Sequence, residues 1–561
     1  MPYGFKAYFV RQGASRIYDN DVGKFLDDHL YAGKILDDLY AERNPGANNA
    51  NNKIDPKKFA GVVSANDKII YVLPKYIDLG GESQWYKEYR EGEEESEKLL
   101  GKATQLLAAI NKYTSDRFAR VGTWKENEED NHGAEERDAE PDPGKSLVGL
   151  ILSMFTDYEE NGLFSAEKGF IEPDGPGDIS WERTIDNVIP FVQDNKPYYF
   201  ELLTRRTVED EENWFRKLHK SVLLDAYGTL CHYGLDTSLG VRRPELEGER
   251  LSYFGESDYV HRRIGQELCV TFRTRQQAVL KNIDAYISRK SEMSSNGIDI
   301  ICYGTANADD LWEKACAAVF GNMLYEPLTA CLEKLSCKEP PSDFLSEGMK
   351  SLTGEAGAGS ACLSEVIDFP LWTPMGKTSE KKRKSFWIGK DIPDIVLLGK
   401  DRHGEKYLYI LDAKNYAPDN IKQYKFEPKP YQLIDEHLFK DKLVMANVPG
   451  IEDIRKQFVY YLDFKDFCEK CGIGNIGNCF LMPSDSEDDE AELIWTVSIG
   501  ALQGAIGACD ISVYALPAAK IYERYIYGET VVLPDYLGSA ARGAKSDNRS
   551  MAPDNAAHKG E

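Results

Sequence analysis

Two apolar runs separated by a short polar turn lie at residues 391–416, in the sequence DIPDIVLLGKDRHGEKYLYILDAKNY. Such runs are typical of paired strands, and the polar residues 402–404 predict the turn of a β-hairpin. Side chains alternate along a strand, so Asp412 and Lys414 would project from one face. Asp394 begins the partner strand, and pairing would bring it beside the end of the second strand. The segment therefore predicts two carboxylates and one ammonium group close together.

This trio of side chains suits phosphodiester hydrolysis. Paired carboxylate oxygens hold Mg²⁺, which polarises a phosphate and lowers the pKa of a bound water. Asp394 and Asp412 are the candidate Mg²⁺ ligands, and Lys414 would orient or help deprotonate the water and stabilise charge on the phosphate. Asp-x-Lys also occurs by chance at the solvated end of a strand, so the spacing alone leaves a purely structural role open.

Helices on either side of the hairpin supply three further candidates. Gln457 and Tyr461 lie one turn apart on the amphipathic stretch 451–467, so both side chains would lie on one face. Glu313 lies in LWEKACAAVF, within residues 309–335, whose apolar spacing predicts a helix with a buried face. Taken singly, each of the three is an ordinary helix residue. Their order along the chain carries the argument.

That order is Glu313, then Pro393-Asp394, then Asp412-Ala413-Lys414, then Gln457-x-x-x-Tyr461. It resembles the PD-(D/E)xK nuclease superfamily, and its last element resembles the RecB-like branch. Further segments are similar to LlaJI-type restriction endonucleases, relatives of the McrC subunit of McrBC systems: FAGVVSANDKIIYVLPKY, DYEENGLFSAEKGFIEPDGPGDISWERTI, LWEKAC and DIRKQFVYY. The segment WERTI at residues 181–185 is more specific than the short catalytic motif.

The resemblance implies an α/β fold: a PD-(D/E)xK domain with a mixed central sheet flanked by helices, preceded by a β-containing N-terminal region and a helical middle region. It implies a type II or type IV restriction endodeoxyribonuclease, a phosphodiester hydrolase that cuts foreign double-stranded DNA with Mg²⁺. Asp394, Asp412 and Lys414 take the catalytic positions by this resemblance. Gln457, Tyr461 and Glu313 take less certain supporting positions.

The resemblance also implies a partner, a McrB-like AAA+ NTPase ring. The McrC-like subunit docks on this ring through its N-terminal part, here residues before about 290, and stimulates hydrolysis. The segment at residues 143–146 lacks the glycine spacing of a phosphate loop, so we expect no nucleotide site in this chain and GTP or ATP on the partner. One active site cuts one strand, so a double-strand break indicates a second copy or two colliding complexes.

Two alternatives stay open from the residues. One is a RecB-like exonuclease that acts in repair without an NTPase. The other is a docking and activating subunit for an AAA+ ring that has lost nuclease activity, against which the intact set of Asp394, Asp412 and Lys414 argues.

The chain has 561 residues, enough for roughly three to four domains. We expect the boundaries to be 1–145 for a β-containing region with an acidic insertion at about 125–142, 146–295 for a mainly helical region, 296–537 for the nuclease domain and 538–561 for a disordered tail. Within the first region, residues 59–74 predict a hairpin and residues 99–110 a helix with one apolar face.

Charge restricts how the chain can meet DNA. It carries 68 Lys and Arg against 93 Asp and Glu, a net charge of −25. This excludes a protein that coats nucleic acid or an acidic membrane with its whole surface, so DNA contact must be local. The densest positive run is Lys381, Lys382, Arg383 and Lys384, which would hold phosphates near the metal or form a solvated loop.

No basic head followed by an apolar stretch opens the sequence, and its apolar runs are too short to span a bilayer, which predicts a cytoplasmic protein. The 11 cysteines are scattered, the pattern of reduced thiols. Cys468, Cys471 and Cys479 would be reduced, partly buried thiols; a zinc or iron-sulfur site there is the less favoured interpretation, because no fourth ligand is evident.

Overall fold

The computed structural model describes residues 5–12, 59–65, 68–80, 86–124, 147–296, 300–305, 307–353, 361–369, 371–372, 385–386, 391–417, 422–425, 443–446, 448–500, 510–533 and 536–537. The acidic insertion, the segment 143–146, the basic run Lys381 to Lys384 and the C-terminal tail lie outside the described residues. The chain divides into two compact units. Unit 1 comprises Met1–Lys6, Val63–Ile69 and Asp142–Tyr303; unit 2 comprises Ala7–Val62, Ile70–Pro141 and Gly304–Glu561.

The N-terminal strands form a five-stranded sheet in the order β10-β2-β3-β1-β4. Its members are β1 (Lys6–Arg11), β2 (Ala60–Ala65), β3 (Lys68–Leu73), β4 (Tyr86–Glu88) and β10 (Ile300–Thr305). The neighbouring positions of β2 and β3 confirm the hairpin expected at residues 59–74. Helix α3 (Glu94–Trp124) follows, with three glutamates in its first turn that favour a helix start. It buries the expected face through Leu99, Ala103, Leu106, Leu107 and Ile110.

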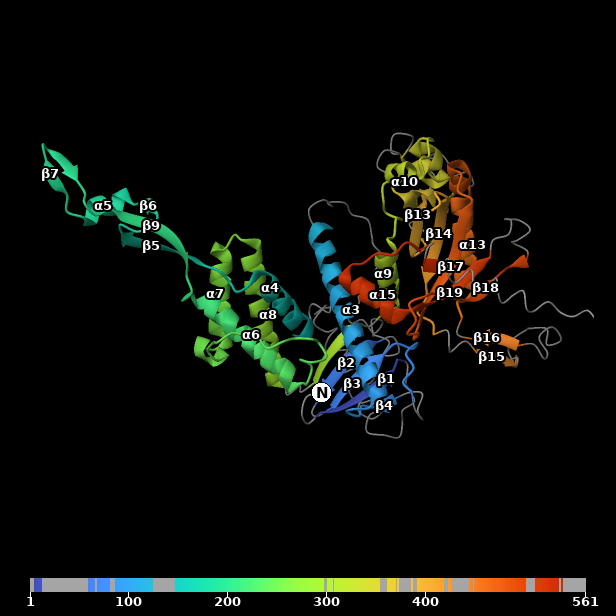
Figure 1. The fold of residues 1–561 in the computed structure, drawn as a ribbon, viewed down its shortest axis with the longest axis horizontal. Helices are drawn as coiled ribbons and strands as arrows, with labels where there is room; N and C mark the ends of the chain where they lie inside the picture. The colour runs from blue at the N-terminus through green and yellow to red at the C-terminus, as the bar shows by residue number, and fades with distance from the viewer. Residues whose placement is uncertain are drawn as a thin grey trace, which may run out of the picture. The chain divides into compact units, whose positions relative to one another are not determined.

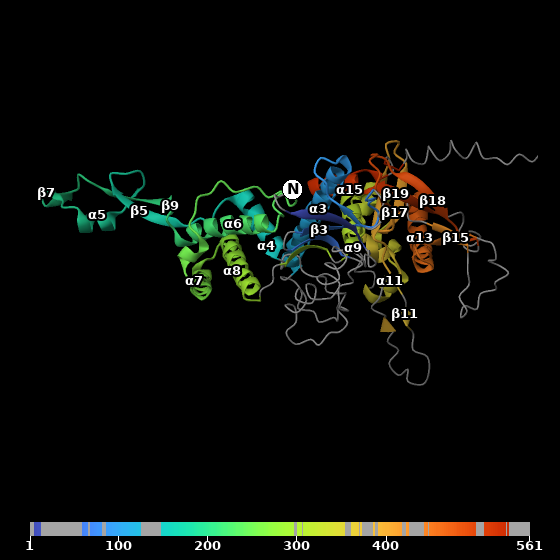
Figure 2. The same cartoon turned by 90° about the horizontal axis from the view of Figure 1, so that it is seen from below.

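Unit 1 is built mainly from the helices α4 (Leu147–Asn161), α6 (Trp214–His232), α7 (Ser257–Val270) and α8 (Thr274–Asn296). Between α4 and α6 the chain forms a segment of short strands, which we call the arm (residues 167–209; Figures 1 and 2). The arm contains β5 (Glu167–Pro173), β6 (Asp178–Ile179), α5 (Trp181–Asn187), β7 (Phe191–Gln193), β8 (Lys196–Tyr198) and β9 (Leu203–Glu209). It holds a three-stranded sheet, β5-β9-β6, and the hairpin β7-β8. The region expected to be mainly helical therefore also carries five strands.

Unit 2 contains a second five-stranded sheet, in the order β13-β14-β17-β19-β18. Its strands are β13 (Ile395–Lys400), β14 (Lys406–Ala413), β17 (Asn475–Ser484), β18 (Glu492–Val497) and β19 (Ile511–Pro517). The pairs β13-β14 and β18-β19 are antiparallel, whereas β14-β17 and β17-β19 are parallel. This confirms the mixed central sheet and the α/β fold class.

Helices flank this sheet (Figures 1 and 2). Helix α13 (Ile451–Cys471) packs on β14 and β17, α9 (Ala308–Phe320) packs on β14, and α15 (Ala518–Tyr527) packs on β19 and on α3. Apolar side chains of β13, β14, α10 (Leu328–Leu335) and α13 form one core, including Val396, Ile410 and Phe464. A second core joins α13 to β17 and β19.

One expected element was wrong. Residues 309–335 do not form a single helix, because α9 ends at Phe320 and α10 begins at Leu328. Gly321 adopts a φ of +79°, the left-handed conformation that glycine tolerates, and Pro327 precedes α10. The break matters for the site described below.

The expected helix at 451–467 is confirmed as α13, which extends to Cys471 and so ends with the Cys468/Cys471 pair. The ten cysteines within the described residues are all free. Among the helices that the structure describes, none combines the length and apolarity needed to cross a membrane.

Candidate functional site

The β13-β14 hairpin places Asp394 opposite Asp412. Ile395 pairs with Leu411, so the residues one step further lie side by side where β13 begins and β14 ends. The Asp394 Oδ2 atom accepts a hydrogen bond of 2.8 Å from the Ala413 N–H. This bond fixes one carboxylate against the backbone beside the other.

The break between α9 and α10 holds the start of β13 in place. Asn322 donates from Nδ2 to the Asp394 carbonyl over 2.8 Å and accepts the Val396 N–H at Oδ1 over 3.1 Å. One side chain thus satisfies the backbone on both sides of Ile395. Sequence reasoning missed Asn322, and the Gly321-Asn322 pair, a common helix stop, was the signal that marked the break.

Lys414 follows β14 and lies at the centre of the site. Its Nζ atom is 2.9 Å from Asp412 Oδ1 and 3.4 Å from Asp453 Oδ1. The backbone N–H of Lys414 donates to the Leu481 carbonyl of β17 over 2.9 Å, and Trp312 Nε1 donates to the same carbonyl over 3.1 Å. The two strands and α9 therefore meet at one backbone oxygen directly beside the lysine.

Crowded carboxylates perturb one another here. Burial, followed by the hydrogen bond and charge of Asp412, raises the pKa of Asp394 to about 9. Burial, then the charge of Asp310, raises the pKa of Glu313 to about 7, although Lys414 opposes the shift. The charges of Asp412 and Lys414 act on Glu313, so α9 brings this residue to the same site.

The pKa of Lys414 responds to opposing influences. Burial alone would lower it, but the charge and hydrogen bond of Asp412, with the charges of Asp394 and Asp453, raise it above its usual value. Lys414 therefore carries its positive charge at neutral pH, as a group that stabilises an anion must.

Helix α13 presents Gln457 in its interior face. The side chain is 0% exposed, and neither the oxygen nor the nitrogen of its amide has a hydrogen-bond partner among the described residues. A buried amide without partners is costly, and each such group in a folded protein calls for an explanation such as a bound water or ion. Gln457 lies one turn after Asp453, and its backbone carbonyl accepts a hydrogen bond of 3.0 Å from Asn478 Nδ2 of β17.

The two neighbouring tyrosines of α13 differ. Tyr461, the predicted position, is half-buried and packs against both apolar cores. Tyr460 is buried, and burial followed by the charges of Asp391, Asp412 and Asp394 raises the pKa of its phenol. Sequence reasoning missed Tyr460, although its spacing of three from Gln457 was an available signal.

The donor set fits a magnesium ion. Asp394 and Asp412 offer hard carboxylate oxygens. Glu313 is close enough for the charges of Asp412 and Lys414 to act on it, and the unpartnered amide of Gln457 lies on α13. Within the described part of the chain, no three His, Cys, Asp or Glu side chains converge as a ready metal cage. Mg²⁺ does not need one, because it is usually bound by one or two carboxylates and completes its shell with water and substrate phosphate.

The cysteines singled out in the sequence are buried. Cys468 and Cys471 belong to the apolar core of β13, β14 and α13, and Cys471 lies beside Cys337. Cys479 is on β17, where it pairs with Leu411 and Ser512.

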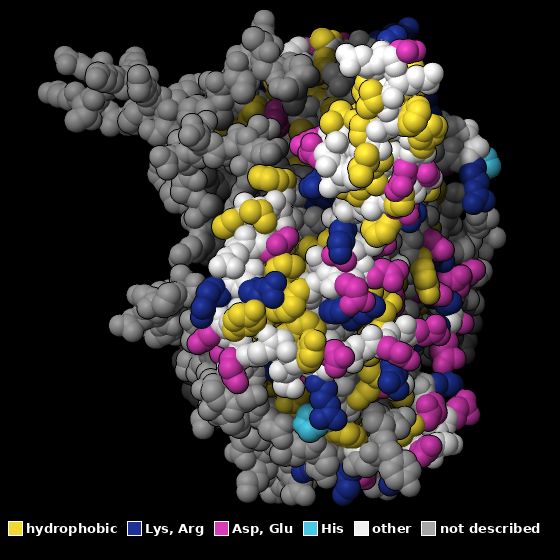
Figure 3. Space-filling view, turned by 90° about the vertical axis from the view of Figure 1, so that its left-hand side faces the viewer, with side chains coloured by type: hydrophobic (Ala, Val, Ile, Leu, Met, Phe, Trp, Pro, Cys, Tyr) yellow, Lys and Arg dark blue, Asp and Glu magenta, His cyan; other side chains and the backbone are white. Residues whose placement is uncertain are grey.

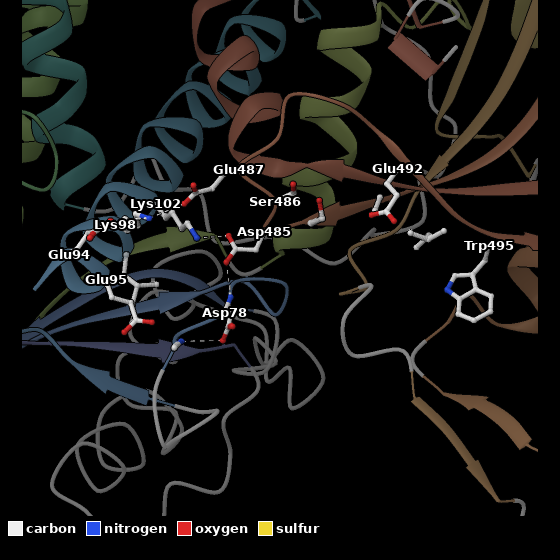
Figure 4. Close-up of a pocket in the computed structure, with 15 residues that line it drawn as sticks. Asp78, Glu94, Glu95, Lys98, Lys102, Asp485, Ser486, Glu487, Glu492 and Trp495 are labelled. Atoms are coloured by element: carbon white, nitrogen blue, oxygen red, sulfur yellow. Dashed lines mark hydrogen bonds and ion pairs between the residues drawn. The ribbon is translucent and has the colours of Figure 1, made fainter. Parts of the chain in front are cut away.

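A separate cleft of about 790 Å³ lies in unit 2 and contains none of the candidate site residues (Figure 4). Its walls come from the first turns of α3, the chain near Asp78 and the β17-β18 connection. Asp485 accepts from Lys102 Nζ over 2.7 Å and from the Asp78 N–H over 2.9 Å. Acidic and basic side chains also line this cleft, so charge and size alone do not single out the candidate site at β13 and β14.

Comparison with known proteins gives two similarities. Residues 59–334, just under half of the chain, match the family model of the LlaJI restriction endonuclease. The matched range includes the arm and Glu313 and ends before Asp394. The chain is also 23% identical over 497 residues to the type II restriction enzyme BsuMI component YdjA of Bacillus subtilis (strain 168), with 88% of this chain and 85% of that protein covered. The expected resemblance to LlaJI-type enzymes is confirmed.

Proposed function

From this likeness to LlaJI-type restriction endonucleases we propose that the chain is the DNA-cutting subunit of an NTP-dependent restriction system directed against foreign double-stranded DNA. The observation that carries the proposal is the convergence of Asp394, Asp412 and Lys414 where β13 begins and β14 ends, on a mixed sheet. Asp394 and Asp412 would hold Mg²⁺, with Glu313 as a further oxygen donor.

The electrostatics support a bound cation. Asp394 and Glu313 have raised pKa values because they are buried next to other carboxylates. A divalent cation relieves that repulsion and favours the ionised forms. When bound, Mg²⁺ supplies charge neutralisation at the scissile phosphate and lowers the pKa of the attacking water.

The protein's own groups would do the rest. Lys414 would orient the attacking water and stabilise the negative charge that grows on the phosphate, because its ammonium group is held in place before the reaction begins. Gln457 would use its unpartnered amide to hold that water or a phosphate oxygen. Tyr460 and Tyr461 pack in the apolar cores beside this residue and would help to position α13 next to the catalytic lysine.

The arm supports docking on a second protein. Nine of its large apolar side chains are exposed: Phe170, Ile179, Trp181, Ile185, Ile189, Phe191, Val192, Tyr198 and Phe200. Hydrophobic side chains are visible on the face that carries the arm (Figure 3). An exposed apolar patch of this kind marks a protein-binding surface. The occupant we propose is a McrB-like AAA+ NTPase, whose hydrolysis of GTP or ATP the chain would stimulate.

Assembly follows from the same proposal. The Bacillus relative is described as one component of a restriction enzyme, which favours a multi-subunit assembly for this chain as well. One site cuts one strand, so two copies of the chain would act on opposite strands.

The test is cleavage of long plasmid DNA with Mg²⁺ by the purified chain, alone and with the proposed McrB-like NTPase plus GTP or ATP. Wild type is compared with Asp412→Ala and Lys414→Ala. Lys470→Ala is the matched control, because Lys470 pairs with Asp466 over 2.7 Å at the other end of α13. Cutting that needs partner and nucleotide, and that only the first two variants lose, is the expected result. Cutting by the chain alone would favour an exonuclease or another nuclease that needs no partner, and NTPase stimulation without cutting would leave only the docking role.

A further inference from the structure

Asp453 is an acidic residue of α13 whose two carboxylate oxygens have different partners. Its Oδ2 atom accepts the Gly450 N–H over 3.0 Å and so caps the start of the helix. Its Oδ1 atom lies 3.4 Å from Lys414 Nζ. Both side chains are largely covered, with 22% of Lys414 and 29% of Asp453 exposed. The carboxylate is therefore held from one side and faces the lysine with the other.

Lys414 has a second anionic neighbour, Asp412, at 2.9 Å. Asp412 has two tasks in the proposed function, because it both contacts the lysine and would bind a cation. A carboxylate that donates its electron density to Mg²⁺ attracts an ammonium group less strongly. Lys414 then needs an anchor that is not a metal ligand and does not lie on its own strand.

We infer that Asp453 is a positioning residue for Lys414, holding the ammonium group at the site while Asp412 serves the cation. The inference rests on the proposed function and assigns a role to a residue outside the set of candidates from the sequence, which are Asp394, Asp412, Lys414, Gln457, Tyr461 and Glu313. Asp453 meets the requirement for a fixed anchor because its capping bond to Gly450 orients the carboxylate. It also links the lysine to the helix that carries Gln457.

Three variants separate positioning from folding. Asp453→Asn keeps the volume and an oxygen that accepts the Gly450 N–H, and removes only the charge. Asp453→Glu returns the charge on a longer side chain. Asp466→Asn is the matched control, because Asp466 also pairs with a lysine, Lys470, on the same helix but outside the site.

The main measurement is single-turnover DNA cleavage by the full chain with its NTPase partner, together with DNA affinity by fluorescence anisotropy. We expect Asp453→Asn to cut about tenfold to a hundredfold more slowly, because an ångström of misplacement at a reacting centre costs up to about a hundredfold. DNA affinity stays within about twofold of wild type, since one partly covered charge pair contributes little to binding. Asp466→Asn cuts at the wild-type rate, and Asp453→Glu regains a large part of the lost rate.

A second measurement does not depend on activity. A double-mutant cycle of Asp453→Asn and Lys414→Met on the urea midpoint of unfolding should be non-additive, because the two side chains interact directly. Fully additive midpoints would overturn the inference.

The outcomes keep the two proposals apart. If Asp453→Asn cuts DNA as fast as an active wild type, this inference alone is overturned. The same holds if Asp453→Asn loses DNA affinity but not the rate of cleavage. Wild type that cuts under no condition overturns the proposed function, and the positioning role falls with it.

Discussion

Two regions differ in which side chains they bury: the site around Asp394, Asp412 and Lys414 in unit 2, which we call the hairpin site, and the arm of unit 1. The site buries carboxylates against one another and against Lys414, at a cost visible in the raised pKa values of Asp394 and Glu313. The arm leaves large apolar side chains in water, Ile189 at 93% and Phe200 at 83% exposure. Each region departs from what stability alone favours, and such departures are expected where a protein carries its function. We propose that the buried charge serves chemistry and that the exposed apolar surface serves binding.

Replacing Asp394 by Asn should show the cost of the buried charge most strongly. Cleavage should fall by about a thousandfold, because a cation ligand at the reacting phosphate is lost. The folded protein should nevertheless become more stable at neutral pH, by about 1 kcal/mol. The amide keeps an acceptor for the Ala413 N–H and replaces a carboxyl group whose pKa of about 9 forces the folded chain to hold it protonated at neutral pH, whereas the unfolded chain ionises it. Plasmid cleavage and thermal unfolding measure the two effects.

Asp391→Asn is the control for Asp394→Asn. Asp391 is exposed and pairs with Lys456 over 3.2 Å, outside the buried cluster. Its replacement should change neither property appreciably. An Asp394→Asn protein that is both inactive and less stable would show that the carboxylate serves the fold and would break the comparison.

A buried histidine at the root of the arm should make unit 1 sensitive to acid. His219 accepts the Phe164 N–H at Nδ1 over 3.1 Å, and burial lowers its pKa from 6.5 to about 4. The unfolded chain binds a proton near pH 6.5 and the folded chain only near pH 4, so stability is full above 6.5 and falls as pH drops between these values. The loss should approach about 3 kcal/mol at pH 4.

Urea unfolding of unit 1 at pH 7 and pH 4.5, followed by circular dichroism, measures this effect. His219→Gln keeps an acceptor and removes the titration, so the pH dependence between 6.5 and 4 should shrink. His403→Gln in the exposed β13-β14 turn is the control and should leave the dependence unchanged. An unchanged profile in the His219 variant would contradict the assignment.

Removing one apolar side chain from the arm should weaken partner binding without harming the fold. Phe200→Ser should reduce affinity for the NTPase by about 2 kcal/mol, roughly thirtyfold, as expected for an aromatic anchor of an interface. Unfolding should change by less than about 0.5 kcal/mol, since the side chain is already in water. Phe272→Ser, 89% exposed but outside the arm, is the matched control. Equal losses of affinity for the NTPase in both variants would contradict the proposal that the arm is the docking surface.

Sequence reasoning succeeded where the determinants are local. The strands β13 and β14, their turn and the face of α3 follow from apolar runs, turn residues and helical spacing within short windows. The register that puts Asp394 beside Asp412 follows from the length of the turn. The same windows failed for the arm, because strands of two to seven residues with exposed side chains lack the buried alternation that marks a strand.

The supporting residues of the site could not be found in this way. Asn322 meets Asp394 across 72 positions, and Asp453 meets Lys414 across a helix start, so both contacts depend on tertiary packing. The choice between Tyr460 and Tyr461 depends on the rotation of α13 about its axis, which a spacing of four does not determine. The roles of the candidate residues stay predictions until the variants are measured.

The smallest expected effect concerns the ion pair in the cleft of Figure 4. It tests whether charged side chains of unit 2 outside the hairpin site affect stability or cleavage. Asp485→Asn removes the charge that Lys102 meets at 2.7 Å but keeps an acceptor for the Asp78 N–H. The side chains of Lys102 and Asp485 are 24% and 15% exposed, so the pair should contribute about 0.5 to 1 kcal/mol, measured by a double-mutant cycle with Lys102→Met in urea. Cleavage should be unchanged, because none of the residues that line this cleft belongs to the hairpin site. A large loss of cleavage with normal stability would instead tie this ion pair to the hairpin site through β17, whose Leu481 carbonyl accepts the Lys414 N–H.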